Sequence, residues 1–446
     1  MMTNRNLFAQ LPALAIEPAK FDTLFAAKDF RERLITAIQT AKQRIYLVSL
    51  YLEDDEAGRE IMTELYKAKQ KKPNLDISVC VDWHRAQRGL IGVAANRTNA
   101  AMYQELAEQH EHKIPVYGIP VRGREVFGVL HLKGFIIDDD VFYSGASLNN
   151  IYLHYKERYR FDRYHIITNA DLSNSMVRFI QDEMISHPAV HDLTDADKPK
   201  TKQIKADIRQ FRASLAKAAY KFTPQQIGEE HVAVTPLVGV GNKRNKLNQG
   251  INQLLRQAKE EIFICTPYFN FPRSVAKEVK KALKRGVKVH IVVGDKTAND
   301  FYIPPGQAFK TIGGLPYLYE INLRQFAKVN EGFIASRQLS IHLWKHGDNS
   351  FHLKGTWVDN RYMLITGNNL NPRAWKLDLE NALFIQDHQQ HLTEQFQQES
   401  DNILQHTQLI CTYRQLDKIE NYPDGVQKLV RKITRVKADR ILKQIL

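Results

Sequence analysis

The chain has few cysteines, and their spacing excludes a zinc site. Cys80, Cys265 and Cys411 are the three cysteines among 446 residues, and no arrangement of Cys and His has the spacing that zinc ligands require. Cys80 and Cys265 lie inside apolar, strand-like runs. We expect both to be buried free thiols, because an unpaired cysteine is among the residues most often found in a protein interior.

Long apolar runs are also lacking. No window approaches the roughly 18 uninterrupted apolar residues of a membrane-spanning helix. The first residues, MMTNRNLFAQLPALAIEP, contain neither a basic leader nor an apolar run long enough for a signal peptide. An apolar share of 43% and a charged share of 25% are typical of a soluble globular protein, and the length suffices for two or three domains. We expect a cytoplasmic protein.

The chain has fewer acidic residues than basic ones. The 63 Lys and Arg residues outnumber the 49 Asp and Glu residues, which gives a formal net charge of +14. Such a balance indicates an anionic partner, which could be nucleic acid, an anionic membrane surface or a phosphate-rich substrate. Charge alone does not choose among the three.

What the chain does contain is the same pattern twice. HLKGFIIDDDVFYSGASLNN begins at His131, and FHLKGTWVDNRYMLITGNNLN begins at Phe351, so that the two histidines, His131 and His352, are 221 residues apart. Upstream, AKQRIYLVSLYLEDD from Ala41 is matched 217 residues later by AKEEIFICTPYFNFP from Ala258. A near-constant offset over several segments indicates an internal duplication.

Each half predicts an α/β unit. Short β-branched runs bounded by turn residues are typical of buried strands, and helical stretches such as GREIMTELYKAKQKK and SVAKEVKKALKRG separate them. We predict two repeats, each a mixed sheet flanked by helices, packed around one shared active site. The predicted domains are a first repeat (1–197), a basic linker (198–230), a second repeat (231–425) and a basic amphipathic C-terminal helix (426–446).

The linker has two possible roles. Residues 198–222 carry eight Lys or Arg against one Asp, and apolar residues recur there at helical spacing, namely Ile204, Ile208, Phe211 and Leu215. One interpretation is a solvated helix that packs across the two repeats. The other is a surface for anionic headgroups.

The repeated motif presents a histidine and a lysine together. Residues i and i+2 of an extended strand share a face, so His131 and Lys133 point the same way, as do His352 and Lys354, while the leucines between them point into the core. Seven residues after each histidine comes Asp138 or Asp359. The strand parity places these carboxylates on the opposite face, which predicts that they support the catalytic motif through hydrogen bonds.

Two histidines and two lysines suit a phosphodiester. One neutral histidine can attack phosphorus and form a covalent intermediate, and the second can protonate the leaving oxygen and then accept a proton from the acceptor. The lysines would stabilise charge on the non-bridging oxygens. A carboxylate on a neighbouring strand would orient each imidazole, and we expect Asp162 to do so in the first half and Glu380 in the second. The scheme needs no metal or other cofactor.

The turns after the motif offer further donors. GASLN places Asn149, and GNNLN places Asn371, where amide and backbone donors could meet an anion. The motif and turn together resemble the phospholipase D superfamily, whose signature H-x-K-x-x-x-x-D is followed by Gly-Ser-x-x-Asn. The usual serine is replaced by Ala146 in one copy and Asn368 in the other, and Ser147 is a candidate substitute.

Within that superfamily the chain resembles the Gram-negative bacterial type of phosphatidylserine synthase, over essentially its whole length. The resemblance is carried by VDWHRAQRG, VGDKTANDFYIP, LPYLYEINL and ITGNNLNPRAWKLDLENA. It implies transfer of a phosphatidyl group from CDP-diacylglycerol to L-serine with release of CMP. It also implies a metal-independent enzyme that is peripheral to the inner face of the cytoplasmic membrane, and it favours His131 as the nucleophile.

Basic residues next to the predicted strands are candidates for substrate binding. His84, Arg85 and Arg88 follow the strand ISVCVDW at its carboxyl end, where α/β sheets bind ligands, and could clamp a pyrophosphate. Lys296 occupies the corresponding place in the second half, and Arg373 follows Asn371. An ordinary surface cluster of ion pairs is the alternative.

Two segments are candidates for membrane contact. The C-terminal run has seven Lys or Arg and an apolar stripe at helical spacing, so it could lie on an anionic interface or cap the core; the stripe comprises Val426, Leu429, Val430, Ile433 and Val436 and continues at Ile441, Leu442 and Ile445. Residues 299–323 predict a long loop in which four apolar side chains could admit acyl chains, namely Phe301, Tyr302, Ile303 and Phe309. The alternative is a loop folded over its own core.

Other functions fit the motif less well. A phospholipase D-type hydrolase would use water as the acceptor. A cardiolipin synthase commonly carries N-terminal spanning helices, which this sequence lacks. A phosphodiesterase or nuclease would use the positive charge for DNA, but the aromatic and basic interleaving of single-strand binders is not seen. A non-catalytic protein that binds nucleic acid or ribosomes would not need both His/Lys pairs, although loose, salt-sensitive binding of such polymers is expected.

Overall fold

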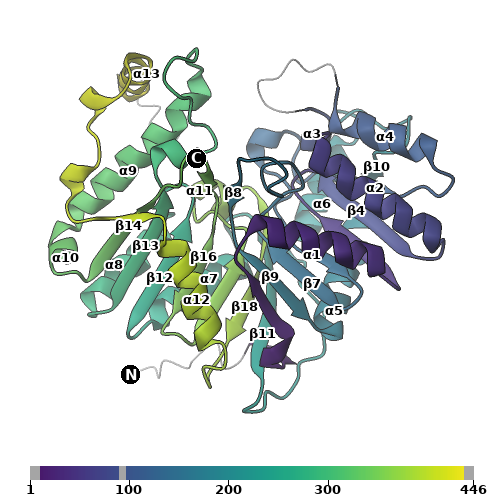
Figure 1. Ribbon diagram of the computed structural model, residues 1–446, viewed down its shortest axis with the longest axis horizontal. Helices are drawn as coiled ribbons and strands as arrows, with labels where there is room; N and C mark the ends of the chain where they lie inside the picture. Colours follow the sequence, from purple (N-terminus) through teal and green to yellow (C-terminus); the bar gives the residue numbers. More distant parts are fainter. Residues whose placement is uncertain (1–10, 90–96, 436–446) are drawn as a thin grey trace.

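The computed structural model describes residues 11–89 and 97–435. Two α/β repeats lie side by side, the first at the right and the second at the left of Figure 1, and each has a large mixed sheet with helices packed on it. This confirms the predicted fold class. Cys80 and Cys265 are buried free thiols, as predicted.

The sheet of the first repeat has eight strands within the described residues, in the order β10-β5-β4-β3-β6-β7-β9-β2. Strands β3, β4 and β5 run parallel, and the remaining neighbours are antiparallel. The strands are β2 (Phe21–Leu24), β3 (Arg44–Val48), β4 (Asp76–Asp82), β5 (Val116–Ile119), β6 (Phe135–Ile137), β7 (Asp140–Ser144), β9 (Tyr164–Thr168) and β10 (His191–Asp192).

The sheet of the second repeat has nine strands within the described residues, in the order β1-β11-β18-β17-β16-β12-β13-β14-β19. Strands β12, β13 and β14 form its parallel centre, in the same place as β3, β4 and β5. The strands are β1 (Leu14–Ile16), β11 (Val232–Val240), β12 (Glu261–Thr266), β13 (Lys288–Gly294), β14 (Leu339–Trp344), β16 (Gly355–Val358), β17 (Tyr362–Thr366), β18 (Leu379–Gln386) and β19 (Thr407–Ile410).

Amphipathic helices cover both sheets. The first repeat contains α1 (Ala27–Thr40), α2 (Glu56–Lys71), α3 (Trp83–Ala86), α4 (Asn99–Gln109), α5 (Ala170–Arg178), which continues into a π-helical turn η4 (Phe179–Ile185), and the linker helix α6 (Lys205–Leu215). The second contains α7 (Lys246–Gln257), α8 (Arg273–Lys284), α9 (Leu315–Val329), α10 (Glu331–Ala335), α11 (Pro372–Lys376), α12 (Thr393–Leu404) and α13 (Asp424–Arg435).

The first strand does not belong to the repeat that the sequence assigns it to. Strand β1 pairs antiparallel with β11, with Leu14 opposite Val234, and so extends the second sheet. All nine residues of β11 are buried, and β1 covers what would otherwise be an open, apolar sheet edge. The first residues of the predicted repeat 1–197 thus pack with the sheet of the second repeat.

The linker forms a packed helix. Ile208, Phe211 and Leu215 of α6 are buried in the main core, and Arg212 reaches the second repeat, where its Nη1 donates to the carbonyl of Leu377 over 3.0 Å. The structure thus favours the interpretation of a helix packed across the repeats.

The apolar stripe of the C-terminal helix packs on the rest of the protein. Val426 and Val430 of α13 are buried in a small cluster with Tyr317 and Tyr422, so these residues are not available to a membrane, because they already fill an apolar contact on α9 and its neighbours. Of the remaining predicted stripe residues, Leu429 and Ile433 are half-buried, and Val436, Ile441, Leu442 and Ile445 lie outside the described residues.

The segment 299–323 is a loop only in its first half. After a 3₁₀ turn η6 (Thr311–Gly314), helix α9 begins at Leu315, which corrects the prediction of a loop throughout. Pro316 lies in the first helical turn, where a missing N–H costs nothing. Phe309 is 43% exposed, whereas Phe301, Tyr302 and Ile303 are half-buried.

Candidate active site

Each H-x-K segment lies just before a strand rather than within it. Gly134 lies between Lys133 and β6, and Gly355 follows Lys354 as the first residue of β16; their φ angles are 126° and 155°. A side chain at either glycine would collide with a neighbour, Met176 or Arg163. The predicted regular strand is therefore wrong here, because the chain bends at glycine after each lysine and leaves the histidine and lysine outside the large sheets.

The first segment is held by β18 of the second repeat. The amide of His131 donates to the carbonyl of Leu379 over 2.9 Å, and its Nδ1 lies 2.9 Å from Oε2 of Glu380. The Asn381 side chain then binds both backbone groups of Lys133, each at 2.8 Å. Three consecutive residues of one repeat thus position the motif of the other.

The second segment is held in the same way by the first repeat. Ser350 and Phe351, which form β15, pair in parallel with Arg160 and Phe161, which form β8. The amide of His352 donates to the carbonyl of Phe161 over 2.8 Å. Its neighbour Asp162 then contacts the ring of His352, with Nδ1 and Oδ2 2.8 Å apart.

The two carboxylates are therefore exchanged between the repeats. The sequence predicts that Asp162 serves the first half and Glu380 the second, whereas Glu380 contacts His131 and Asp162 contacts His352. Both residues were predicted to orient an imidazole, and both are in contact with one. The pairing is wrong because each H-x-K segment packs against the last strands of the other repeat.

The two motifs share one buried site. His131 and His352 are each 6% exposed, and Lys133 and Lys354 are 2% and 1% exposed. Lys354 contacts the His352 ring and lies 3.4 Å from Oδ2 of Asp162. No ion pair is found for Lys133 among the described residues.

Burial sets the electrostatics of this site. Burial, reinforced by Lys133 and Lys354, lowers the pKa of His131 well below its ordinary value, and burial followed by Lys354 does the same to His352. Burial also lowers the pKa of Lys133 to about 8 and that of Lys354 to about 7. The charge of Lys354, from the second motif, thus lowers the pKa of His131 in the first, so the two motifs interact electrostatically.

The pKa values of the two carboxyl groups are shifted upward, whereas those of the histidines and lysines are shifted downward. Burial raises the pKa of Glu380 well above its ordinary value and also raises that of Asp162. Lys133 and Lys354 bring two ammonium groups into this buried site, and an anionic phosphate would be attracted to them.

The motif aspartates lie elsewhere. Asp138 accepts hydrogen bonds from the amides of residues 42, 43 and 44 at 2.7 to 3.1 Å, and Asp359 accepts them from residues 259, 260 and 261 at 2.8 to 2.9 Å. Both therefore anchor the start of a central strand, β3 or β12. Neither carboxylate is found in contact with a motif histidine or lysine within the described residues, so their place in the catalytic group is a structural one.

The glycines of the two Gly-x-x-x-Asn turns pack directly against site residues. Gly145 lies against the carboxylate of Asp162, and Gly367 against the side chain of Lys133. The oxygens of the two turn asparagines cap the chain, because Asn149 accepts from the amide of residue 152 at 3.0 Å and Asn371 from that of residue 374 at 2.9 Å.

The residues that replace the usual serine differ between the turns. Ser147 is buried. Asn368 is also buried, and its Nδ2 finds no hydrogen-bond partner within the described residues. Ala146, its counterpart, has no such donor. The second turn therefore offers an amide donor in the position where the family signature has a hydroxyl.

The predicted basic residues of the first repeat gather around one glutamate. Arg88 binds Glu125 through two hydrogen bonds of 2.8 and 2.9 Å, and Arg85 lies 3.6 Å from the same carboxylate. From the second repeat, Arg373 donates to the carbonyl of Glu125 over 2.9 Å. His84 contacts the carbonyl of Arg122 at 2.7 Å. The arginines thus form a cluster that crosses the repeat interface.

Lys296 does not join this cluster. Its ammonium lies 2.9 Å from Glu320 and 2.8 Å from Asp417, so two carboxylates already neutralise it. The alternative of an ordinary ion-pair cluster describes Lys296 better than the predicted phosphate contact.

Four residues of the site were missed from the sequence. The hydroxyl of Tyr152 lies 3.1 Å from both ring nitrogens of His352, and the ring of Tyr268 lies 6.3 Å from the same imidazole. Behind them, Arg160 and Asp300 form an ion pair of 2.9 Å. No motif marks these positions, although Asp300 lies in the stretch VGDKTANDFYIP, which carries part of the family resemblance.

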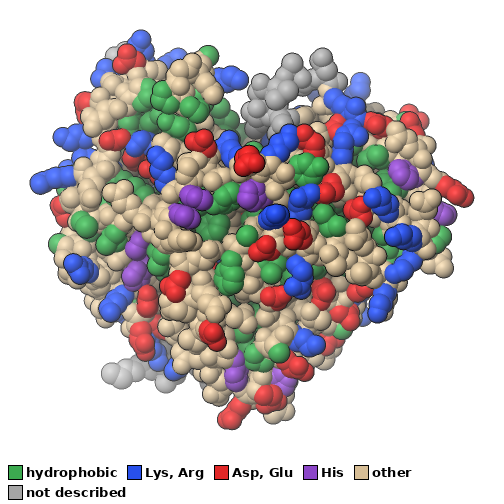
Figure 2. Space-filling model, viewed as in Figure 1, with side chains coloured by type: hydrophobic (Ala, Val, Ile, Leu, Met, Phe, Trp, Pro, Cys, Tyr) green, Lys and Arg blue, Asp and Glu red, His purple; other side chains and the backbone are tan. Residues whose placement is uncertain are grey.

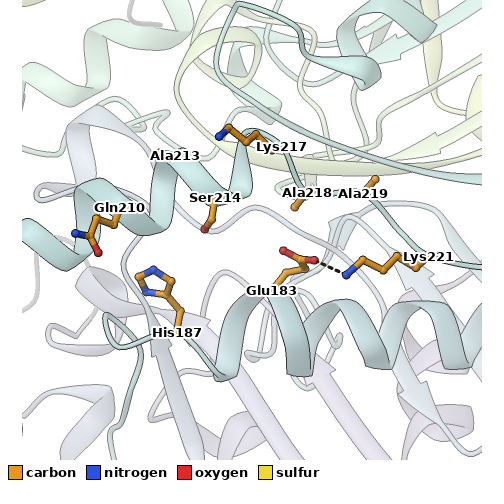
Figure 3. Close-up of a pocket in the computed structure, with 9 residues that line it drawn as sticks. All are labelled: Glu183, His187, Gln210, Ala213, Ser214, Lys217, Ala218, Ala219 and Lys221. Atoms are coloured by element: carbon orange, nitrogen blue, oxygen red, sulfur yellow. Dashed lines mark ion pairs between the residues drawn. The ribbon is translucent and has the colours of Figure 1, made fainter.

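A surface hollow lies away from this site. A cavity of about 660 Å³ lies between α6 and η4 and contains none of the predicted site residues. Figure 3 shows its lining, in which Lys221 pairs with Glu183 across the groove and His187 faces α6. Among the described residues no group of three or more His, Cys, Asp or Glu is arranged to hold a metal ion, and no helix is both long and apolar enough to span a bilayer.

Known proteins with the same organisation identify the family. The family model described as "Cardiolipin synthase, PLD-like domain" matches residues 34–182 and 251–403, one segment in each repeat. The CDP-diacylglycerol–serine O-phosphatidyltransferase of Haemophilus influenzae is 48% identical over 442 residues, which cover 98% of this chain and 97% of that protein. The Escherichia coli enzyme of the same name is 49% identical over 439 residues, with coverages of 98% and 97%.

The fold agrees along the whole chain. The crystal structure of phosphatidylserine synthase from Haemophilus influenzae superposes with a TM-score of 0.95 at 47% identity, covering 99% of this chain and 100% of that one. These matches confirm the resemblance that the motifs predict. The chain belongs to the phospholipase D-like family and, within it, to the family of the CDP-diacylglycerol–serine O-phosphatidyltransferases.

Proposed function

We propose that the chain is a phosphatidylserine synthase that transfers the phosphatidyl group of CDP-diacylglycerol to L-serine and releases CMP. The observation that carries the proposal is the pair of buried histidine–carboxylate contacts, one built from each repeat and completed by the other, in a chain 48% identical to enzymes of that name. The reaction serves phospholipid biosynthesis.

In the first step His131 is the nucleophile. Burial and the nearby lysines lower its pKa, which keeps the imidazole neutral, and Glu380 at Nδ1 leaves Nε2 to attack phosphorus. The P–O bond to CMP breaks as the P–N bond forms. His352 donates a proton to the leaving oxygen, and the negative charge of the bound diphosphate favours the protonated form of His352 that this requires.

In the second step His352 acts as the base. It accepts the hydroxyl proton of serine while the serine oxygen attacks phosphorus and the P–N bond to His131 breaks. Phosphatidylserine forms, and His131 returns to the neutral state. Lys133 and Lys354 neutralise the non-bridging oxygens in both steps.

The arginine cluster suits the diphosphate of the donor. Arg85, Arg88 and Arg373 come from both repeats and converge on Glu125, and planar guanidinium groups favour bidentate contact with phosphate. Arg373 also pairs with Asp378 over 3.2 Å, so three guanidinium groups face two carboxylates, and the excess positive charge would attract an anion.

A peripheral position on an anionic membrane, at the inner face of the cytoplasmic membrane, fits the basic surface. Lys428, Arg431 and Lys432 of α13 are exposed, and Figure 2 shows apolar side chains gathered beside α13 with Lys and Arg around them. Each basic residue near an anionic surface contributes about 1 kcal/mol.

Two further features favour the same partner. A second hollow of about 320 Å³ beside α6 is lined by Arg122, Lys205, Arg209 and Arg212. The half-exposed Phe309 and the neighbouring loop residues are our candidates for acyl-chain contact. The same positive charge would bind nucleic acid or ribosomes loosely and in a salt-sensitive way.

The experiment measures CMP release from CDP-diacylglycerol in detergent micelles with EDTA, with and without L-serine, and identifies the lipid product. We expect CMP release that depends on serine, with phosphatidylserine as the product. Release that is independent of serine, with phosphatidic acid as the product, would make the chain a hydrolase. An absence of release would exclude CDP-diacylglycerol as donor.

A further inference from the structure

The wall of the site next to His352 contains a charged pair that the phosphoryl chemistry does not use. Arg160 comes from β8 of the first repeat, and Asp300 from the loop after β13 of the second. Nη2 of Arg160 and Oδ1 of Asp300 are 2.9 Å apart, and the two side chains are 11% and 12% exposed. The pair therefore lies almost fully inside the protein at the junction of the repeats.

Both members of the pair are charged. Although burial opposes it, Asp300 holds the pKa of Arg160 well above its ordinary value. Although burial would raise it, Arg160 and then His352 hold the pKa of Asp300 below its ordinary value. A buried ion pair is a poor source of stability, because the loss of hydration offsets most of the attraction. Its presence beside a catalytic histidine suggests a role in binding.

Two tyrosines connect the pair to His352. The guanidinium of Arg160 lies over the ring of Tyr152, 4.5 Å from its centre, and the Tyr152 hydroxyl contacts His352. The hydroxyl of Tyr268 donates to Oδ2 of Asp300 over 2.6 Å, and the Tyr268 ring faces the same imidazole. Each charge is thus one aromatic ring away from His352.

One carboxylate oxygen of the pair can still accept a hydrogen bond. Oδ1 of Asp300 is buried, and among the described residues it has no hydrogen-bond partner, so its closeness to Arg160 is a contact of charge alone. Arg160 is fixed by a 3.2 Å hydrogen bond from Nε to the hydroxyl of Ser350. A buried acceptor without a donor is costly, and an ammonium group would satisfy it.

We propose that Arg160 and Asp300 form the subsite for the acceptor, in which Arg160 binds the α-carboxylate and Asp300 the α-ammonium of serine. This inference rests on the proposed function. A zwitterion carries one charge of each sign and is matched by one cation and one anion, whereas an amino alcohol or a hydroxy acid leaves one of them unpaired. Bound in this way, serine presents its hydroxyl to His352, which agrees with His352 as the base.

The test compares acceptors on purified full-length variants, with L-serine, ethanolamine and 3-hydroxypropionate as probes. Arg160→Gln should raise the KM for L-serine roughly 10- to 100-fold and reduce the preference for serine over ethanolamine, which has no carboxylate. Asp300→Asn should raise the same KM to a similar extent and reduce the preference over 3-hydroxypropionate, which has no ammonium. The KM for CDP-diacylglycerol should stay within about twofold in both.

Controls separate binding from folding. Glu399→Gln removes a charge from another buried pair between the repeats, Arg163 and Glu399, which are 2.7 Å apart; it should lower the melting temperature and leave both acceptor preferences unchanged. If Arg160→Gln or Asp300→Asn fails to fold, Tyr268→Phe, which removes only the hydrogen bond to Asp300, should raise the KM for serine several-fold.

The outcomes are distinct. Unchanged serine KM and unchanged preferences in the folded variants would make the pair a structural contact and overturn the subsite. A raised KM for CDP-diacylglycerol with an unchanged KM for serine would make Arg160 a phosphate ligand, which also overturns it. Wild-type protein that releases CMP without using serine would instead overturn the proposed function.

Discussion

The two H-x-K segments are equivalent in sequence and in the way they are held. His131 is tied to Leu379 and Glu380 of the second repeat, and His352 to Phe161 and Asp162 of the first. Each repeat therefore completes the site of the other, and neither repeat contains an oriented histidine by itself.

The surroundings of the two histidines are not equivalent. Asn381 clamps the backbone of Lys133, whereas the corresponding residue of the first repeat, Arg163, turns away to bind Glu399. Around His352 lie Tyr152 and Tyr268 with a charged pair behind them. This difference fits our proposal that one histidine serves the covalent step and the other serves proton transfer.

The sharpest way to test this comparison is to remove each histidine. His131→Ala and His352→Ala should each reduce steady-state turnover by at least about 10⁴-fold, because one variant loses the nucleophile and the other the acid and base. The measurement is serine-dependent CMP release at saturating substrates. A variant that retained more than about a hundredth of the activity would show that the second histidine suffices.

The exchanged carboxylates give the next largest effect. Glu380→Gln should lower turnover roughly 10²-fold through misorientation of His131. Asp162→Asn should lower it further, because Asp162 also lies beside Lys354. The measurement is turnover at saturating substrates, with the melting temperature as the check on folding. Equal losses would contradict the asymmetry between the two sides.

Replacement of each of the two lysines should change the pH dependence of the protein's stability by a different amount. Burial lowers the pKa of Lys133 from 10.5 to about 8, so between these values the folded state binds fewer protons than the unfolded state, and the free energy of unfolding rises with pH. From about pH 7 to about pH 9.5 the rise should be roughly 2 kcal/mol. Lys133→Met should abolish this rise and stabilise the protein near neutral pH.

The partner lysine is the control for that experiment. Burial lowers the pKa of Lys354 further, to about 7, so Lys354→Met should remove a larger rise of the free energy of unfolding, one that begins about one pH unit lower. Denaturant unfolding of both variants at the two pH values measures the difference. A destabilised Lys133→Met would show that this ammonium is compensated in the folded state.

The motif aspartates should give the smallest and most symmetric effect. Asp138→Asn and Asp359→Asn each weaken three backbone hydrogen bonds at the start of a central strand, so each should cost about 2 kcal/mol of stability. Turnover per folded molecule should stay within a few-fold of wild type. A large loss of turnover in a fully folded variant would place the aspartate in the catalytic machinery after all.

Much of the fold follows from the sequence because duplication repeats every local signal. Strands β3 and β12, helices α2 and α8, and both H-x-K segments were predicted from paired stretches, and the superfamily resemblance rests on the same residues. The helical start of α9 was missed because the paired prolines at 304 and 305 and the paired glycines at 313 and 314 are typical of a loop, although the proline at 316 is favoured in a first helical turn.

What the sequence could not show is which repeat supplies a group to which histidine. Periodicity reports local structure, but the exchange of Glu380 and Asp162 depends on how β8, β15 and β18 cross between the repeats. The residues around His352 were missed for a related reason. Arg160 and Asp300 are 140 positions apart, and no repeated motif marks either of them.

The central claim is that a phosphatidyl group is carried on His131 and released by His352. The most direct test incubates the wild-type protein with CDP-diacylglycerol labelled in its diacylglycerol phosphate, without serine, denatures it at alkaline pH, and maps the labelled peptide after proteolysis. We predict an acid-labile label on the peptide that contains His131, and none in His131→Ala. A label on another residue, or an acid-stable label, would contradict the account.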